Sequence, residues 1–404
     1  MLLRDTLVSV LAAPVAVGPP GAEVPRQVLK SLRRAAGHAL VLTGVRRCGK
    51  STLQAQLRRQ EGGPAVFCNL EDTRLYGLGP ADFPTLLSVL EEHHAGASVF
   101  LDEVQEVPEW QRLVRALLDG GRNVCVTGSN ASLLGRELGA KLTGRHVSVE
   151  VHPFSYGEYL AFRGRERGSA TLRDYLDEGG FPGALRDPTL GGTLLRELLR
   201  DVVQRDIVSR HGLRDTRHLM NLALHLLAHT GQPLSLQSLA KGLAIPSAAQ
   251  AARYVEYLQA AWLVLSVPRF SASFKQRVVS PPKYYAIDPG FRAANTPNPT
   301  PDLGRRLENA VLLALRRRGA APAFAVEANQ WECDFVTPEE AVQVCAEVTP
   351  QNRGRELRGL LAAADLPGAR GRGRELRVLT LDQRDSLKED GRRIEVLPAW
   401  EWLD

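Results

Sequence analysis

The chain has 404 residues, of which 44% are hydrophobic and 24% charged, with a formal net charge of +6. This composition is ordinary for a globular chain of two or three domains. Five scattered cysteines without a CxxC or CxxH pair argue against a disulfide framework and a zinc site, and no apolar run reaches the roughly 18 residues that a membrane span needs. The mild positive charge permits nucleic acid as a partner but does not demand it.

The first apolar stretch, residues 7–17, is short enough to resemble a secretion signal. However, Asp5 stands beside Arg4 ahead of this stretch and Pro14 interrupts it, so we expect a packed N-terminal helix. With an intracellular type of nucleotide site downstream, we expect a cytoplasmic protein without a membrane partner.

A phosphate-binding loop is predicted at residues 44–52, where the sequence reads GVRRCGKST. The apolar run 39–43 predicts a buried strand before the loop, and a helix is expected from residue 52 to 59, which is the context that this motif requires. Glycines let backbone N–H groups converge on phosphate, Lys50 can reach the β and γ oxygens, and Ser51 can ligate Mg²⁺. The predicted ATP-binding residues are Gly44, Val45, Arg46, Arg47, Cys48, Gly49, Lys50, Ser51 and Thr52.

A second strand is expected at residues 64–70, a helix at 82–93, and a third strand at 97–104 that ends in Asp102 and Glu103. This third strand has the form of a Walker B element. Asp102 would hold the Mg²⁺ shell, and Glu103 would polarise the water that attacks the γ-phosphate. A helix at 108–118 and a strand at 123–130 follow, and Ser129 or Asn130 at the strand end could contact the γ-phosphate or that water. An ordinary strand-end turn is the alternative for this pair.

Six segments in a fixed order carry a family resemblance: GVRRCGKST, VFLDEVQ, VTGSNASLL, LTGRH, PFSYGEYL and GGFPGAL. The chain resembles the bacterial and archaeal AAA+-like P-loop ATPases that carry a DUF4143 C-terminal region. The resemblance implies a parallel sheet with the Walker B strand placed between the loop strand and a neighbour, and Asn130 or Ser129 as the sensor. It also implies that Arg145 acts on the γ-phosphate, in its own chain or from a neighbouring subunit. A salt bridge is the alternative role for Arg145.

The middle of the chain begins with a turn-rich boundary at residues 179–188. Further on, residues 235–265 have a helix-turn-helix pattern, which in the resembling family looks like a winged helix. One interpretation is a DNA recognition helix with Arg253 on its exposed face. The alternative is a winged-helix fold used for packing, because Arg253 is the one cation on an alanine-rich helix.

The C-terminal region contains a predicted helix at 303–317 with Glu308 and two predicted strands, 332–336 with Asp334 and 344–349 with Glu347. These three acids resemble the Mg²⁺-binding set of the PD-(D/E)xK nuclease fold. In that nuclease fold a lysine two residues after the last acid helps to activate water. Here this position is Thr349, so we expect a degenerate domain that does not cut nucleic acid. A lysine from elsewhere, or Arg353 or Arg355, could substitute.

An arginine-rich stretch follows these strands. A phosphate-contacting patch is one interpretation and a solvated loop is the other. The candidate DNA contacts in this stretch are Arg353, Arg355, Arg370 and Arg372. Arg253, in the helix-turn-helix segment, is a further candidate DNA contact.

The predicted fold class is α/β. We expect an AAA+-like P-loop ATPase domain in residues 1–178, a helical and winged-helix-like domain in 179–295, and a nuclease-like α/β domain in 296–404. The predicted function is Mg²⁺-dependent ATP hydrolysis with ATP and Mg²⁺ as cofactors, coupled to DNA binding, remodelling or translocation. The expected catalytic residues are Lys50, Glu103, Asn130 and Arg145, and a homo-oligomer follows if Arg145 acts across subunits. The alternatives are a nucleotide-dependent switch or scaffold for a protein partner and an ATP-gated nuclease.

Overall fold

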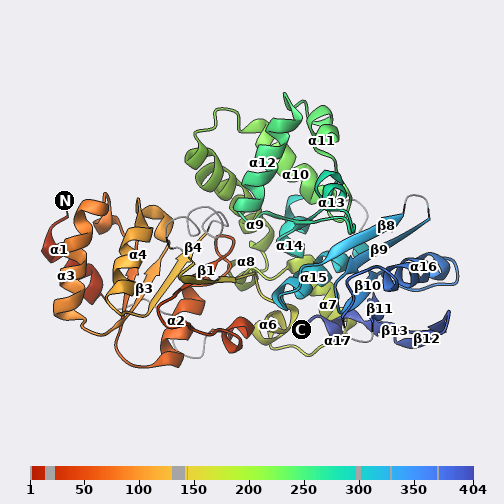
Figure 1. Cartoon of the computed structure of the whole chain (residues 1–404), viewed down its shortest axis with the longest axis horizontal. Helices are drawn as coiled ribbons and strands as arrows, with labels where there is room; N and C mark the ends of the chain where they lie inside the picture. Colours follow the sequence, from red (N-terminus) through yellow and green to blue (C-terminus); the bar gives the residue numbers. More distant parts are fainter. Residues whose placement is uncertain are drawn as a thin grey trace. The chain divides into compact units, whose positions relative to one another are not determined.

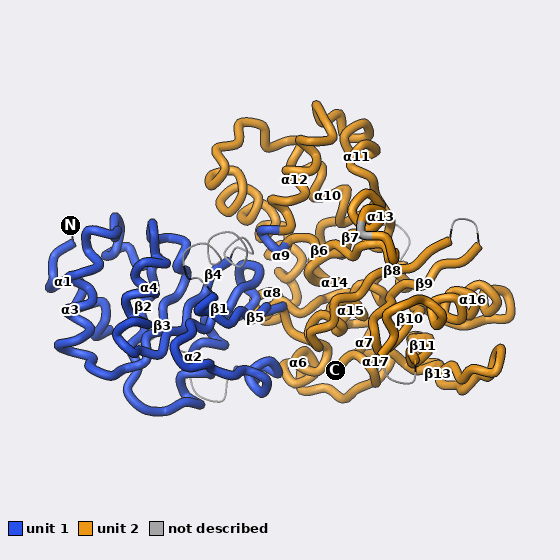
Figure 2. The backbone as a smooth tube through the Cα atoms, viewed as in Figure 1, with its two compact units in different colours: residues 1–152, 260–262 blue, residues 153–259, 263–404 orange. Residues whose placement is uncertain are grey.

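The computed structural model describes residues 2–13, 23–129, 142, 144–296, 302–327, 330–370 and 373–404. The chain divides into two compact units (Figure 2). Unit 1 comprises residues 1–152 and 260–262, and unit 2 comprises residues 153–259 and 263–404.

Unit 1 is built on a five-stranded sheet in the order β2-β3-β4-β1-β5, in which every pairing is parallel. Four of its strands, β1 to β4, form at the runs that were predicted to be strands, because short runs of Val, Leu and Phe suit a parallel sheet covered by helices. Parallel strands place all their carboxyl ends at one edge, which is where open α/β sheets bind ligands. The strands are β1 Ala39–Thr43, β2 Ala65–Asn69, β3 Ser98–Asp102, β4 Val124–Gly128 and β5 His146–Glu150.

The strand order corrects one expectation. We expected the Walker B strand to lie beside the loop strand, but β4 lies between β1 and β3. Backbone pairing fixes this order, because β4 pairs with β1 through Leu40 and Cys125 and with β3 through Val99 and Val124.

Helices cover both faces of this sheet (Figure 1). Residues of α1, α3 and α4 share one apolar core with Val41, Val99 and Val126 of the strands. Helix α2 lies on the opposite face, where its Gln54 amide contacts the Cys125 side chain and donates to two strand carbonyls. The α-helices are α1 Arg4–Ala12, α2 Lys50–Glu61, α3 Phe83–His93 and α4 Trp110–Asp119, with short 3₁₀ turns at Gln27–Lys30, Thr73–Leu75, Pro80–Asp82 and Val104–Glu106.

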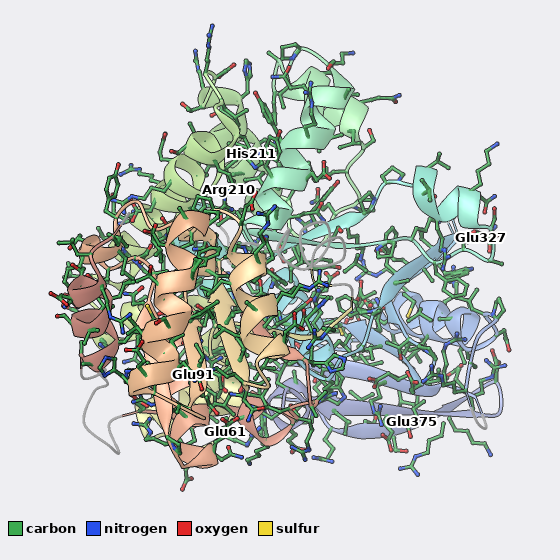
Figure 3. The ribbon with its side chains drawn as sticks, turned by 60° about the vertical axis from the view of Figure 1, so that its left-hand side comes forward. Glu61, Glu91, Arg210, His211, Glu327 and Glu375 are labelled. Carbon is green, nitrogen blue, oxygen red and sulfur yellow. The ribbon has the colours of Figure 1, made fainter. Side chains whose placement is uncertain are left out.

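The outer surface of unit 1 is charged. Glu61 at the end of α2 and Glu91 in α3 are exposed there (Figure 3). Each pairs with an arginine of the same unit, Glu61 with Arg34 and Glu91 with Arg122. Surface ion pairs of this kind contribute little stability, so the core rather than the surface holds unit 1 together.

Unit 2 begins with helices and contains a small two-stranded sheet. Helix α9 continues into a π-helical segment, Val202–Ser209. The α-helices are α6 Tyr156–Arg163, α7 Ser169–Glu178, α8 Pro182–Arg186, α9 Gly191–Asp201, α10 Arg217–Ala228, α11 Leu236–Gly242, α12 Ala248–Ala260, α13 Phe274–Val279 and α14 Pro289–Asn295, and the antiparallel strands are β6 Val264–Val267 and β7 Lys283–Ala286.

The second part of unit 2 is a six-stranded mixed sheet in the order β12-β13-β11-β10-β9-β8. Helix α16 packs on one of its faces through Leu357, Leu360 and Ala363. The strands are β8 Ala323–Glu327, β9 Trp331–Val336, β10 Glu340–Val344, β11 Glu375–Thr380, β12 Asp385–Glu389 and β13 Arg392–Pro398, and the helices are α15 Leu303–Arg317, α16 Arg353–Ala364 and α17 Ala399–Trp402.

One local expectation for this region was wrong. The strand predicted at 344–349 is β10, which ends at Val344 and pairs antiparallel with β9. The arginine-rich stretch after it contains a helix, α16, because its leucines and alanines recur on one face and meet the sheet.

The grouping into units also differs from the three predicted domains. The first division falls after His152 rather than after residue 178, because α7 packs against α14 and α15 within unit 2. A separation of residues 179–295 from 296–404 inside unit 2 remains a prediction. Among the helices of the described residues, none is both long enough and apolar enough to cross a lipid bilayer.

Gly359 allows α16 to approach β9 closely. A Cβ atom there would lie 1.8 Å from the Glu332 carbonyl oxygen, whereas a Cβ on Gly354 of the same helix would meet nothing within 4 Å. We expect Gly359→Ala to lower the free energy of unfolding of unit 2 by about 1–3 kcal/mol through overpacking. Gly354→Ala should leave it unchanged or raise it by up to about 1 kcal/mol.

Urea unfolding of the two full-length variants beside wild type measures the difference. Equal stability of the two variants would contradict the close packing of α16 on β9.

Candidate functional site

The predicted phosphate loop connects β1 to α2 at the carboxyl edge of the sheet in unit 1. Two of its glycines are required by close packing. A Cβ on Gly44 would lie 2.0 Å from the Val151 carbonyl oxygen, and one on Gly49, whose φ is +102°, would lie 2.8 Å from a guanidinium nitrogen of Arg26. The loop is therefore held against neighbouring backbone, with the amino end of α2 behind it.

Lys50 places its charge inside this loop. The residue is 3% exposed, and its Nζ donates to the carbonyl oxygens of Gly44 and Val45 at 3.1 Å each. The same Nζ lies 3.9 Å from Oε1 of Glu103. The loop lysine and the predicted catalytic acid thus face one space, although they lie far apart in the sequence.

A chain of hydrogen bonds connects the loop to the ends of β3 and β4. Ser51 Oγ donates to Asp102 Oδ2 at 2.7 Å, and Thr127 Oγ1 donates to Asp102 Oδ1. Thr127 also accepts the Glu103 backbone N–H at 2.9 Å. Burial raises the pKa of Asp102 above its ordinary value, although the hydrogen bonds from Thr127 and Ser51 oppose this rise. These contacts bring the two predicted metal ligands, Ser51 and Asp102, into direct contact.

Glu103 stands in an unusual backbone conformation, with φ +54° in the left-handed region. Such a conformation is uncommon for a residue with a side chain and is found at functional sites. Its carboxylate accepts a hydrogen bond from the Gln105 amide. Sequence reasoning gave no role to Thr127 or Gln105, although both lie in segments that carry the family resemblance. The polar end of β4 was the signal for Thr127.

Arg26 is a further residue that sequence reasoning missed. It is 4% exposed, and its guanidinium donates to the carbonyl oxygens of Cys48 in the loop, at 2.8 Å, and of His152, at 2.6 Å. A buried cation is stable only when hydrogen bonds satisfy it. Arg26 therefore fixes the loop to the segment that follows β5, and no local pattern in the sequence announces this.

The residues present fit a magnesium nucleotide. The loop carries the buried cation of Lys50 and the exposed Ser51, and Asp102 supplies a hard carboxylate ligand next to it. Ser129 Oγ, at the end of β4, is buried and has no hydrogen-bond partner among the described residues. Asn130, the other predicted sensor, lies outside the described residues.

Arg145 does not reach the loop of its own chain. It directly precedes β5, so it lies at the amino end of this parallel sheet, opposite the loop. There it pairs with Asp119 at 2.5 Å and donates to the Gly37 carbonyl at 3.1 Å. The prediction that Arg145 acts on the γ-phosphate within the chain is therefore wrong, and action on a neighbouring subunit remains a prediction.

A second cluster of charges lines a pocket of about 320 Å³ within unit 2. Glu308 of α15 and Asp334 of β9, two of the predicted nuclease-like acids, meet there. Between them is Lys283 of β7, whose Nζ lies 3.1 Å from Glu308 and 3.2 Å from Asp334. Lys283 was not predicted to belong to this site, and no spacing in the sequence points to it.

Glu347 is not part of this pocket, which corrects the predicted acid set. Because β10 ends at Val344, Glu347 lies beyond the strand and is exposed. The position opposite Asp334 on the neighbouring strand belongs to Gln343, whose Oε1 accepts the Asp334 N–H at 3.2 Å. Among the described residues, no group of three or more His, Cys, Asp or Glu side chains is arranged to hold a metal ion.

Three of the arginines predicted to contact DNA are paired with carboxylates. Arg353 pairs with Glu389 at 3.2 Å, Arg355 with Glu356 at 2.5 Å and Arg370 with Glu339 at 2.9 Å. Arg253 is exposed on α12, and Arg372 lies outside the described residues.

Two protein families match different parts of the chain. Residues 36–160 match the family described as an AAA domain, and residues 169–302 match a domain of unknown function, DUF8612. The first match supports a P-loop ATPase, and with the parallel sheet of unit 1 it confirms the predicted P-loop NTPase fold followed by helical and α/β regions. In the region where the resemblance suggested DUF4143, the family found is DUF8612.

Two curated proteins match over most of the chain. The uncharacterized protein MJ1544 of Methanocaldococcus jannaschii is 30% identical over 392 residues, which cover 90% of this chain and 87% of that protein. An uncharacterized protein of Haemophilus influenzae is 30% identical over 337 residues, 77% of this chain and 83% of its own length.

Solved structures show weaker similarity. AMPPCP-bound DnaA from Aquifex aeolicus has a TM-score of 0.28 and 13% identity, covering 58% of this chain and 86% of that one. The Aeropyrum pernix ORC1 protein in complex with DNA has a TM-score of 0.27 and 14% identity, covering 72% and 90%. Similarity at this level does not place the ligands of those proteins on this chain.

The acidic pocket gives unit 2 a specific pH dependence. Burial, with the neighbouring Asp334 carboxylate, raises the pKa of Glu308 to about 7 from an ordinary 4.5, although Lys283 opposes this. The folded protein therefore binds this proton more tightly than the unfolded chain, and the contribution of Glu308 to stability falls as the pH rises from about 4.5 to about 7. We expect Glu308→Gln to flatten the unfolding free energy over this window.

Urea unfolding at a series of pH values measures the effect. Glu347→Gln, which removes an exposed carboxylate outside the pocket, is the matched control and should follow the wild-type profile. Parallel profiles for wild type and Glu308→Gln would contradict the assignment.

Proposed function

The chain belongs to the same protein family as MJ1544 of Methanocaldococcus jannaschii, and we propose that it is a Mg²⁺-dependent ATP hydrolase of the AAA+ type. The single observation that carries the proposal is the contact of Ser51 Oγ with Asp102 Oδ2 at 2.7 Å. It joins the predicted Walker A and Walker B elements at the carboxyl edge of one parallel sheet, beside the buried Lys50.

Each residue has a distinct proposed role. Lys50 would bind the β- and γ-phosphates in exchange for its two loop carbonyls, and Ser51 and Asp102 would hold Mg²⁺. The bound metal would neutralise charge on the phosphates. Glu103 would accept the proton of the attacking water, because its carboxylate already faces Lys50 across 3.9 Å.

Thr127 is a positioning residue in this proposal. Its hydroxyl holds the Asp102 carboxylate and the backbone N–H of Glu103 at the same time, so one side chain aligns a metal ligand with the base. It is fully buried. Its loss should therefore slow turnover more than it weakens nucleotide binding.

Graded substitutions separate these roles. We expect Lys50→Ala to abolish ATP binding, and Glu103→Gln to bind ATP while losing at least about 100-fold in turnover, since the base is removed. Thr127→Val should lose about 10- to 100-fold in kcat with little change in KM, because one hydrogen bond to a charged group disappears. Thr127→Ser keeps the hydroxyl and should retain activity.

ATP binding by fluorescence titration and phosphate release measure these effects. Normal turnover in Glu103→Gln would refute the base assignment, and failure of Thr127→Ser to restore kcat would refute the positioning role.

We propose DNA as the target of this activity. The order of elements supports a winged helix: α10, an isolated bridge between Pro233 and Lys283, α11, α12, then the antiparallel pair β6 and β7. Arg253 is exposed on α12, the recognition position of such a module. The segment between β6 and β7 contains α13, which adds Lys275 and Arg277. The arginines around α16 support DNA binding less, since their carboxylate partners reduce their net charge.

A protein-partner switch is the second candidate. The observation that favours it is also on α13, where Val278 and Val279 are 68% and 70% exposed. Adjacent exposed valines fit an apolar protein surface better than a phosphate backbone.

ATP turnover with and without duplex and single-stranded DNA discriminates these candidates. Stimulation that falls steeply with salt is expected for DNA, and Arg253→Ala should weaken it. Arg370→Ala, which removes an arginine paired with Glu339, is the matched control and should have a smaller effect. If the rate of ATP turnover does not respond to DNA but differs between wild type and Val278→Ser, the result would support the protein-partner switch instead.

A further inference from the structure

The pocket of unit 2 has a lysine at its centre. The Lys283 side chain is 2% exposed, and its Nζ lies 2.7 Å from Glu332, 3.1 Å from Glu308 and 3.2 Å from Asp334. The three acids come from two elements, α15 and β9, while the lysine comes from β7. An ammonium has three N–H donors, so three carboxylate oxygens satisfy it completely.

The carboxylates are held in place by further hydrogen bonds. Glu308 Oε1 also accepts the Tyr285 hydroxyl at 2.6 Å, and Asp334 Oδ2 accepts the Val344 backbone N–H at 3.0 Å. Tyr285 stands two residues after Lys283 on β7, so both point from the same face of that strand toward Glu308. The acids are therefore oriented toward one central point, which the ammonium occupies.

The neighbouring strand offers no further ligand at that point. Gln343 of β10 lies opposite Asp334, but its Oε1 accepts the Asp334 N–H and its Nε2 donates to Glu356 at 2.8 Å. Both ends of this amide are thus committed to the protein. Arg305 and Arg355 line the same pocket and add positive charge at its wall.

The charge balance explains why a cation must stay there. Converging buried carboxylates repel one another, and a positive charge between them offsets this repulsion. Burial alone would lower the pKa of Lys283, but Glu308 and Asp334 outweigh it and raise that pKa well above its ordinary value. Lys283 therefore stays charged across the physiological pH range.

We propose that Lys283 is the built-in cation of this acidic cluster and occupies the point where a cluster of this composition would otherwise take a divalent metal ion. The pocket is closed to metal in the native chain, and unit 2 does not cut nucleic acid through it. In the native chain these acids, all of which are among the described residues, are not arranged to hold a metal ion. Removal of the ammonium would free Glu308, Glu332 and Asp334 to form a divalent-cation site. The proposal concerns unit 2 only and is independent of ATP hydrolysis in unit 1.

Titration of the nucleotide-free, full-length protein with Mn²⁺ tests this proposal, with free Mn²⁺ measured by electron paramagnetic resonance and stability measured as Tm. Methionine matches the length of lysine without its charge, so Lys283→Met is the informative variant. We expect it to bind one more Mn²⁺ per chain than wild type and to gain several degrees in Tm with Mn²⁺. The double variant Lys283→Met/Asp334→Asn should lose most of this gain.

Several outcomes would overturn the proposal. One is binding of Mn²⁺ to the wild-type pocket, seen as Mn²⁺ binding that the Asp334→Asn substitution abolishes. Another is Mn²⁺-dependent nicking of DNA by wild type that the same substitution abolishes. If Lys283→Met does not fold without metal, we expect Mn²⁺ to restore its folding. The proposal is also refuted if Mn²⁺ neither raises the Tm of folded Lys283→Met nor restores folding of the unfolded variant. Lys283→Arg, which keeps the charge, should behave as wild type toward Mn²⁺.

Discussion

The Asp102 carboxylate is the interaction on which the nucleotide site of unit 1 depends. One of its oxygens accepts from Ser51 at the start of α2, and the other accepts from Thr127 at the end of β4. A buried carboxylate is costly unless it is hydrogen-bonded, so these partners and Asp102 stabilise one another. The strand order makes the arrangement possible, because β4 lies between the loop strand and β3 and places Thr127 beside both acids.

The motif residues of this site could be predicted because their signals are local. A glycine loop after an apolar run, and an apolar run that ends in two acids, each place chemistry at a strand end without knowledge of the rest of the chain. Arg26 could not be predicted in this way, since it acts through carbonyl oxygens of Cys48 and His152, and any residue type supplies a carbonyl. The role of Arg145 came from the family resemblance alone. Because β5 runs parallel to β1, the residue before β5 lies at the edge opposite the loop.

In unit 2 the sequence predicted α15 and β9 but placed the next strand too late, and one strand boundary changed the interpretation of the whole pocket. Residues 340–344 and 344–349 both contain short apolar runs, and pairing with β9 decides between them. Once β10 is Glu340–Val344, the residue opposite Asp334 is Gln343, and Glu347 falls outside. Lys283 enters from a separate two-stranded sheet, so its approach to Asp334 depends on tertiary packing that no spacing encodes.

The two buried lysines of this chain differ in what they contact, and the difference separates a site that can bind a ligand from one that is already filled. Lys50 donates to two neutral carbonyl oxygens. Hydrogen bonds in which both groups are ionised are stronger, so an incoming phosphate can replace these carbonyls. Lys283 already has three carboxylates, which no anion can improve on, and a free metal ion must displace an ammonium that is tethered to β7. Burial alone would not distinguish the two residues, since both are almost fully enclosed. The charge of the acceptor atoms does distinguish them. Lys50 in unit 1 can exchange its carbonyl acceptors for a ligand, whereas Lys283 in unit 2 is a fixed electrostatic centre.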